Sequence, residues 1–138
     1  MAQDLAEGQV VSKERTKGRN WEKAVAIWLT AQGVGAKRYE SVCDPRGDLD
    51  MDLPFVVECK DVGAFSPGVW TDQAARSAER VGCFGRFIVF AKRRGKASPA
   101  HAYAIVPMPF LADLLIAWEH QLKADINVTP PHPFRVDL

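Results

Sequence analysis

The segment at residues 86–91, Arg-Phe-Ile-Val-Phe-Ala, constrains the fold more than any other part of the chain. An uninterrupted apolar run of this length is typical of a β-strand that is covered on both faces. Such a strand requires packed structure on each side of its sheet. We therefore expect an α/β architecture with helices packed around a sheet.

The remaining hydrophobic patterns supply the other elements of that architecture. Helices are predicted at residues 20–32, 69–81 and 110–123. Strands are predicted at residues 36–43, 54–60, 86–91 and 102–106, with a short strand or bend before residue 54. The predicted fold class is a central mixed β-sheet flanked by helices, in the order αβββαββα. The last helix is expected to turn its apolar stripe inward, a stripe formed by Leu111, Leu114, Leu115, Trp118 and Leu122.

The length of 138 residues fits one domain, and a hydrophobic fraction of 47% is enough for a core. We expect a flexible basic arm at residues 1–17, a folded domain at residues 18–123 and an extended proline-rich tail at residues 124–138. No apolar run reaches the roughly 20 residues of a membrane helix, and no signal peptide is visible. A cytoplasmic protein without a membrane partner is therefore expected. The three cysteines, whose spacing fits neither a disulfide framework nor a zinc site, are expected to be reduced.

The stretch from Asp48 to Lys60 begins acidic, passes through an apolar strand and ends Glu58-Cys59-Lys60. Side chains two apart in a strand share a face, so Glu58 and Lys60 should point one way and Cys59 toward the core. Two carboxylates that converge can hold Mg²⁺, and a neighbouring lysine can neutralise charge that develops on a phosphate. This combination is what phosphodiester hydrolysis requires.

Three alternating aspartates, Asp48, Asp50 and Asp52, also resemble the opening of a calcium loop. The sixth position of that loop would be Leu53 instead of glycine, and the twelfth would be Cys59 instead of glutamate, which excludes it. Asp50 and Asp52 remain alternatives to Asp48 as the carboxylate that joins Glu58.

The net charge is only +1, but basic residues lie on both sides of this acidic centre. Such an arrangement suits an enzyme that grips a polyanion, although two solvated charged loops would give the same pattern. The residues expected to contact nucleic acid are Lys17, Arg19, Arg46, Lys92, Arg93, Arg94 and Lys96.

Several segments together resemble the PD-(D/E)xK nuclease superfamily, and within it the Holliday junction resolvase-like nucleases, including those of actinobacterial phages. The resemblance spans residues 18–106. It rests on Glu22 in the first helix, on Arg46-Gly47-Asp48-Leu49, on Leu53-Pro54-Phe55-Val56-Val57-Glu58-Cys59-Lys60 and on Phe90-Ala91-Lys92-Arg93-Arg94-Gly95-Lys96.

The resemblance implies a restriction-endonuclease-like fold, with residues 18–123 as the nuclease domain. It makes Asp48 and Glu58 metal ligands, completed by the backbone carbonyl of Cys59, and Lys60 the catalytic lysine. Glu22 matches a helix carboxylate that reaches the metal directly or through water. In place of the superfamily's Pro-Asp this chain has Gly47-Asp48, which keeps Asp50 and Asp52 open as ligands.

The implied activity is Mg²⁺-dependent cleavage of branched DNA, with Mn²⁺ able to substitute and four-way junctions as the expected substrate. Symmetric cutting implies a homodimer, and the apolar last helix is a candidate contact. If the protein is phage-encoded, it would act in the host cytoplasm. The alternatives are a nuclease of the same superfamily that acts on flaps, ends or a specific site, a catalytically silent DNA-binding module, and a protein-interaction domain.

Overall fold

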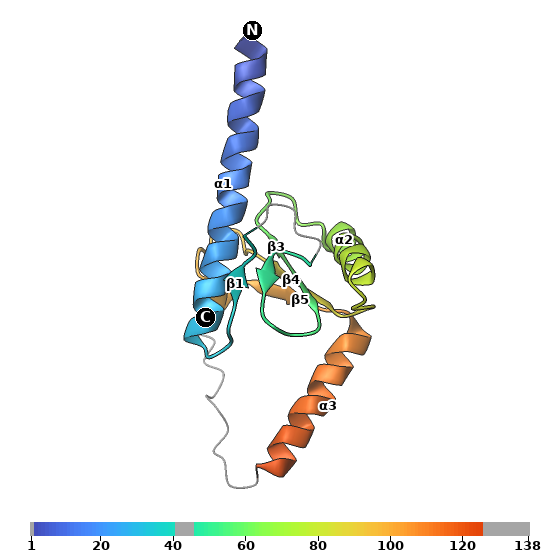
Figure 1. Ribbon diagram of the computed structural model, residues 1–138. Helices are drawn as coiled ribbons and strands as arrows, with labels where there is room; N and C mark the ends of the chain where they lie inside the picture. The colour runs from blue at the N-terminus through green and yellow to red at the C-terminus, as the bar shows by residue number, and fades with distance from the viewer. Residues whose placement is uncertain (1, 41–45, 126–138) are drawn as a thin grey trace.

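The computed structural model describes residues 2–40 and 46–125, with side chains described from residue 13 onward within those ranges. The order of elements agrees with the predicted αβββαββα order (Figure 1). The elements are α1 (Ala2–Ala31), β1 (Lys37–Arg38), β2 (Leu49–Asp50), β3 (Val56–Lys60), α2 (Pro67–Arg80), β4 (Phe87–Ala91), a 3₁₀ turn (Pro99–His101), β5 (Tyr103–Ile105) and α3 (Met108–Ala124).

The strands of the described residues form two small sheets, so the predicted α/β class is confirmed while the single central sheet is not. In the larger sheet β4 lies between β3, to which it is parallel, and β5, to which it is antiparallel. The smaller sheet pairs β1 with β2 in antiparallel fashion. An isolated parallel bridge between Gly47 and Val57 connects the segment before β2 to the outer edge of β3.

The larger sheet is covered on both faces, as the apolar run of β4 predicts. On one face Val89 packs against α2, whose buried stripe is Trp70, Ala74 and Ala78. On the other face Val57 packs against α1 through Trp21 and Val25. Helix α2 lies along one side of the sheet and the second half of α1 along the other (Figure 1). The strand is therefore buried because each of its faces meets a different helix.

Helix α1 begins at Ala2, so it includes most of the segment predicted as a flexible basic arm (residues 1–17) and starts well before residue 20, where the first helix was predicted to begin. The segment contains no proline and is rich in alanine, glutamate, glutamine and lysine, which favour helix even without a core to pack against. The first half of α1 therefore projects beyond the sheet as a continuation of the packed half (Figure 1).

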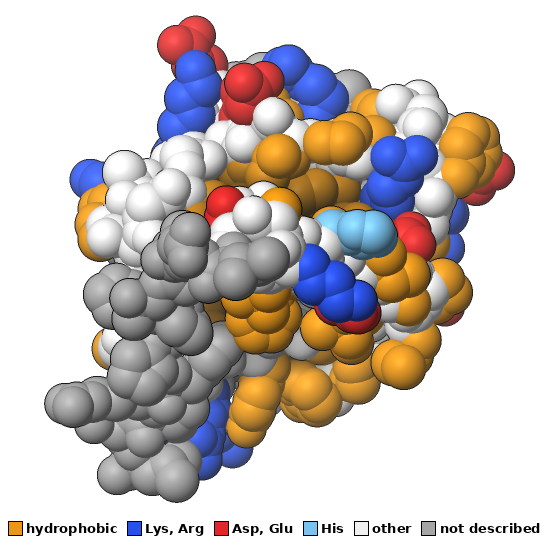
Figure 2. All heavy atoms as spheres, turned by 90° about the horizontal axis from the view of Figure 1, so that it is seen from below, with side chains coloured by type: hydrophobic (Ala, Val, Ile, Leu, Met, Phe, Trp, Pro, Cys, Tyr) orange, Lys and Arg blue, Asp and Glu red, His pale blue; other side chains and the backbone are white. Residues whose placement is uncertain are grey.

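Helix α3 departs from the prediction that its apolar stripe faces inward. Phe110 is buried and packs against Phe55 in a tilted arrangement with ring centroids 5.5 Å apart, but Leu115 and Trp118 are each 52% exposed. The helix projects away from the sheet after its first turn, and the view from below shows many exposed hydrophobic side chains on that side (Figures 1 and 2). An apolar stripe predicts that a helix face will be covered, but it does not predict that the same chain covers it.

The bounds of the other helices and strands differ from the predicted ones by a few residues, and some predictions fall on segments outside the described residues. The strand predicted at residues 36–43 is reduced to β1, and residues 41–45, which include Cys43, are outside the description, as is most of the predicted tail at residues 124–138. Cys59 and Cys83 are free thiols. Among the helices described, none has both the length and the apolar character needed to cross a membrane.

Gly47 is required by the close approach of its segment to β3. Its φ is +103°, and a Cβ atom there would lie 2.6 Å from the carbonyl oxygen of Val57 and 2.9 Å from a methyl group of Val56. A glycine at this position lets the backbone of Gly47 and Asp48 reach the strand edge. A glycine at position 47 therefore has a local structural reason.

We expect Gly47→Ala to lower the free energy of unfolding by about 1–3 kcal/mol, because the methyl group adds a clash to a backbone that already has positive φ. Urea unfolding monitored by tryptophan fluorescence measures the change. Gly35→Ala is the matched control, since a Cβ at Gly35 meets nothing within 4 Å, and it should change stability by less than about 0.5 kcal/mol. Equal stability of the two variants would contradict the proposed close approach.

Candidate active site

Asp48 is fastened to the edge of β3 by two hydrogen bonds. Its backbone N–H donates to the carbonyl of Val57 over 2.7 Å, and its carboxylate accepts the N–H of Cys59, also over 2.7 Å. In a strand the N–H and C=O of one residue point the same way, so the carbonyl of Cys59 faces the same edge. The carboxylate of Asp48 and that carbonyl therefore belong to one site.

Glu58 shares this site with Asp48. Burial raises the pKa of Glu58 to about 8, and the charge of Asp48 together with a hydrogen bond to Asp48 adds to the rise. The ammonium of Lys60 and a hydrogen bond with Ser77 oppose the rise in that pKa. The two carboxylates are thus close enough to compete for one proton.

Lys60 lies on the same face of β3 as Glu58, toward α2, as the strand alternation predicts. Its Nζ donates to Oε1 of Gln73 in α2 over 3.1 Å. Cys59 points the opposite way, packs against the α1 side of the core and has a raised pKa because of burial. A buried thiol with a raised pKa is a poor nucleophile, so Cys59 contributes its backbone and not its sulfur.

Glu22 lies close to the pair but has a partner of its own. Its carboxylate accepts Nε of Arg38 in β1 over 2.9 Å, and its side chain is 20% exposed. Burial raises the pKa of Glu22, the Arg38 hydrogen bond lowers it, and the charge of Asp48 raises it further. The structure therefore brings Glu22 within electrostatic range of Asp48, and its catalytic role stays a prediction.

The competing aspartates are placed differently from Asp48. Asp50 belongs to β2, pairs with Lys37 and accepts the backbone N–H of Asp52 over 3.0 Å. Asp52 is exposed and has a φ of +53°, which marks it as a turn residue. Of the three aspartates, Asp48 is the one that meets Glu58.

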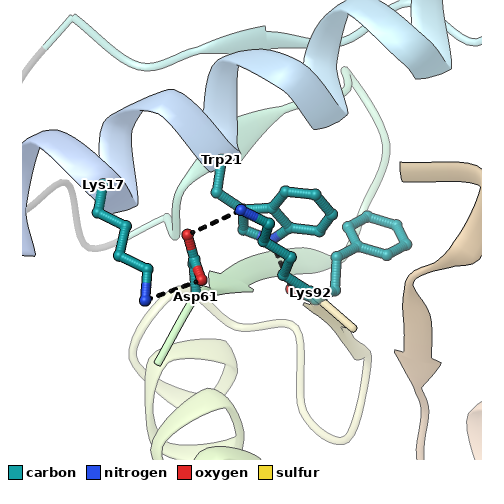
Figure 3. A network of polar contacts seen from close by, with 5 residues as sticks. Lys17, Trp21, Asp61 and Lys92 are labelled. Carbon is teal, nitrogen blue, oxygen red and sulfur yellow. Dashed lines mark hydrogen bonds and ion pairs between the residues drawn. The ribbon is translucent and has the colours of Figure 1, made fainter. Parts of the chain in front are cut away.

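The basic residues predicted to contact nucleic acid separate into two groups. Arg46 lies over the ring of Tyr39 at 4.3 Å, while Arg19, Arg93, Arg94 and Lys96 are exposed. Lys17 and Lys92 instead meet at Asp61, whose side chain is 9% exposed, over 3.3 Å and 3.5 Å (Figure 3). Asp61 thus holds two of the predicted DNA-binding lysines beside the candidate site.

The oxygen atoms at this site fit a divalent cation in part. Asp48, Glu58 and the carbonyl of Cys59 offer oxygen atoms, which Mg²⁺ prefers. Within residues 13–40 and 46–125, however, no three His, Cys, Asp or Glu side chains are gathered around one point. The protein oxygens available to a cation are therefore those of a carboxylate pair and one backbone carbonyl.

Three contacts of the site were not predicted from the sequence. Gln73 on Lys60, Ser77 on Glu58 and Asp61 on the two lysines all join residues more than ten positions apart. The helical period does place Gln73 and Ser77 one turn apart on α2, four residues from each other. That spacing was the available signal, and it becomes informative only once α2 is known to cover this face of β3.

Comparisons of the chain with protein-family models, with curated proteins and with solved structures find no match in any of the three.

We expect Glu58 to make the fold less stable as pH rises. Between about pH 4.5 and about pH 8 the folded protein keeps this proton and the unfolded chain releases it, so each pH unit in that window costs up to about 1.4 kcal/mol. Glu58→Gln cannot ionise and should be more stable than the wild type at pH 8. Urea unfolding between pH 5 and pH 9 measures the difference.

The matched control for this measurement is Glu79→Gln, an exposed position on α2. It should keep the pH profile of the wild type. Parallel profiles for Glu58→Gln and the wild type would show that the Glu58 carboxyl is not the source of the slope.

Proposed function

We propose that the chain is a metal-dependent endonuclease of restriction-endonuclease-like fold that hydrolyses phosphodiester bonds in branched DNA, with four-way junctions as substrate. The observation that carries the proposal is the meeting of Asp48 and Glu58 beside Lys60, at the end of a strand covered by two helices. The junction preference comes from the resemblance of the sequence motifs and is the finer part of the proposal.

The chemistry assigns a role to each group. Asp48, Glu58 and the carbonyl of Cys59 would hold Mg²⁺, which when bound supplies Lewis-acid stabilisation of charge on phosphate oxygens. Lys60 places an ammonium on the same face as Glu58, where it would neutralise charge that develops on the phosphate. Gln73 fixes the lysine's position through the hydrogen bond to Nζ.

The geometry favours Asp48 over Asp50 as the first acidic ligand. Asp48 is fixed against β3 by its own backbone and by Cys59, whereas the carboxylate of Asp50 is used to stabilise the turn at Asp52. The two positions therefore make a matched pair for testing the register.

Incubation of the purified protein with a labelled four-way junction and Mg²⁺ tests the proposal. The wild type should cut, Glu58→Ala and Asp48→Asn should lose cleavage, and Lys60→Ala should reduce the rate by about 10²–10³. Asp50→Asn is the control and should keep near wild-type activity. Linear and flap substrates in the same assay separate a junction enzyme from a nuclease with another preference.

Absence of cleavage by the wild type, or undiminished cleavage by Glu58→Ala, would overturn the proposal. Tight junction binding without metal-dependent hydrolysis would indicate a silent DNA-binding module.

Resolution of a junction needs two cuts, so we propose that a second copy joins through α3. Leu111, Leu115, Trp118 and Leu122 recur at the period of one helical face, and the last three are 52%, 52% and 42% exposed. Such a face matches the apolar, aromatic centre of a homodimer contact.

We expect Trp118→Glu to raise the dimer Kd at least about tenfold, since it places a charge in the centre of that contact. Sedimentation velocity at several protein concentrations measures the change. Ile116→Glu is the control, because Ile116 is 54% exposed on the opposite side of the same helix. A wild type that stays monomeric, or a Trp118 variant that dimerises normally, would contradict a contact through α3.

A further inference from the structure

Asp61 occupies the position directly after β3 and lies on the opposite face of the strand from Lys60. Strand alternation turns Lys60 toward α2 and Asp61 toward α1. Its carboxylate accepts Lys17 of α1 at 3.3 Å and Lys92, the residue after β4, at 3.5 Å (Figure 3). Three segments distant in sequence thus meet at one carboxylate, at the carboxyl ends of two parallel strands. Open α/β sheets bind ligands at such strand ends.

Lys92 is held there by more than its ion pair. Its backbone N–H donates to the carbonyl of Lys60 over 2.9 Å, and its Nζ lies 5.9 Å from the ring centroid of Trp21. Trp21 is itself fixed, because its Nε1–H donates to the carbonyl of Phe90 over 3.1 Å. The position of the Lys92 ammonium is therefore set by the sheet, by α1 and by Asp61 together.

The charges of this group do not cancel. One carboxylate faces two ammonium groups, so the cluster carries an excess positive charge. The side chain of Lys17 is 50% exposed and that of Lys92 is 31% exposed. An ammonium has three N–H donors, and a single carboxylate does not satisfy two such groups. The cluster can therefore bind a second anion from the solvent side without breaking apart.

We propose that Lys17 and Lys92 form a clamp for a DNA backbone phosphate next to the scissile one, and that Asp61 is the positioning residue that sets the spacing of the two ammonium groups. The proposal rests on the proposed function, since Asp61, which holds the clamp, follows Lys60 directly in the chain. A DNA strand that runs across this end of the sheet, from α2 toward α1, would pass Lys60 first and the clamp second. The competing interpretation is an ion network that only fastens α1 to the sheet.

The salt dependence of DNA binding tests the clamp. A labelled four-way junction is titrated by fluorescence anisotropy in EDTA, where no cleavage occurs, over a series of KCl concentrations. Each lost phosphate contact lowers the slope of log K against log salt by about 0.9. Lys17→Gln and Lys92→Gln should each show that loss, and Lys17→Arg should restore the slope. A lysine that is merely structural would change the melting temperature and leave the slope unchanged.

Lys123→Gln is the matched control, because Lys123 is also an ion-paired lysine, 2.6 Å from Glu119, but on α3. It should keep the wild-type slope. Asp61→Asn tests the positioning role by the sign of its effect. Removal of a negative charge near DNA should tighten binding by electrostatics alone, whereas loss of the positioning carboxylate should weaken binding at every salt concentration.

Unchanged slopes in both lysine variants would overturn the clamp, and tighter binding by Asp61→Asn would overturn the positioning role. If Asp61→Asn fails to fold, the salt slope measured with Lys17→Gln decides whether the clamp binds phosphate. That variant loses only one half-exposed ion pair, so it should still fold. If the wild type cleaves junctions but the two lysine variants keep the wild-type slope, the proposed function stands and the clamp is overturned. A wild type that binds no DNA removes both.

Discussion

The attachment of Asp48 to the edge of β3 is the interaction on which the candidate site depends. Two hydrogen bonds, one from its backbone N–H and one to its carboxylate, fix it opposite Val57 and Cys59. Gly47 makes this approach possible, since any larger residue would meet the strand backbone. Because the carboxylate is held by the strand that carries Glu58, the distance between the two acids is set by secondary structure and not by a loop. A site built on a strand in this way is more precise than one built on flexible segments.

The alternation of side chains along β3 places two charged groups on opposite faces of the strand. Toward α2 it presents Glu58 and Lys60, which α2 supports with Ser77 and Gln73. Toward α1 it presents Cys59 to the core and then Asp61 to two lysines. The parallel pairing of β3 with β4 brings Lys92 to the same sheet end. Chemistry and anion binding can thus lie side by side without sharing a face of the strand.

The parts of this structure that the sequence predicts are those with local causes. The burial of β4 on both faces and the alternation of side chains along β3 each follow from the residue pattern within one segment, and each is confirmed. The first helix was predicted to begin at residue 20, whereas α1 begins at Ala2, in a segment without proline that contains several residues of high helix propensity. The prediction that the apolar stripe of α3 faces inward was wrong, because an amphipathic pattern does not identify what covers the apolar face. The contact of Lys17 with Asp61 could not be predicted, since nothing local encodes a contact across 44 positions.

The charged side chains at the sheet end form separate groups. Glu22 is matched by Arg38, and Asp61 is matched twice, by Lys17 and Lys92. Asp48 and Glu58 lie next to each other, and the Lys60 ammonium that lowers the pKa of Glu58 also donates to Gln73. Because burial and the charge of Asp48 raise the pKa of Glu58 to about 8, the pair holds a proton at neutral pH, and a cation bound between the two carboxyl groups would replace that proton. The arrangement of these groups, and not the aspartate-rich sequence as such, is therefore what supports this pair as the site of the proposed metal.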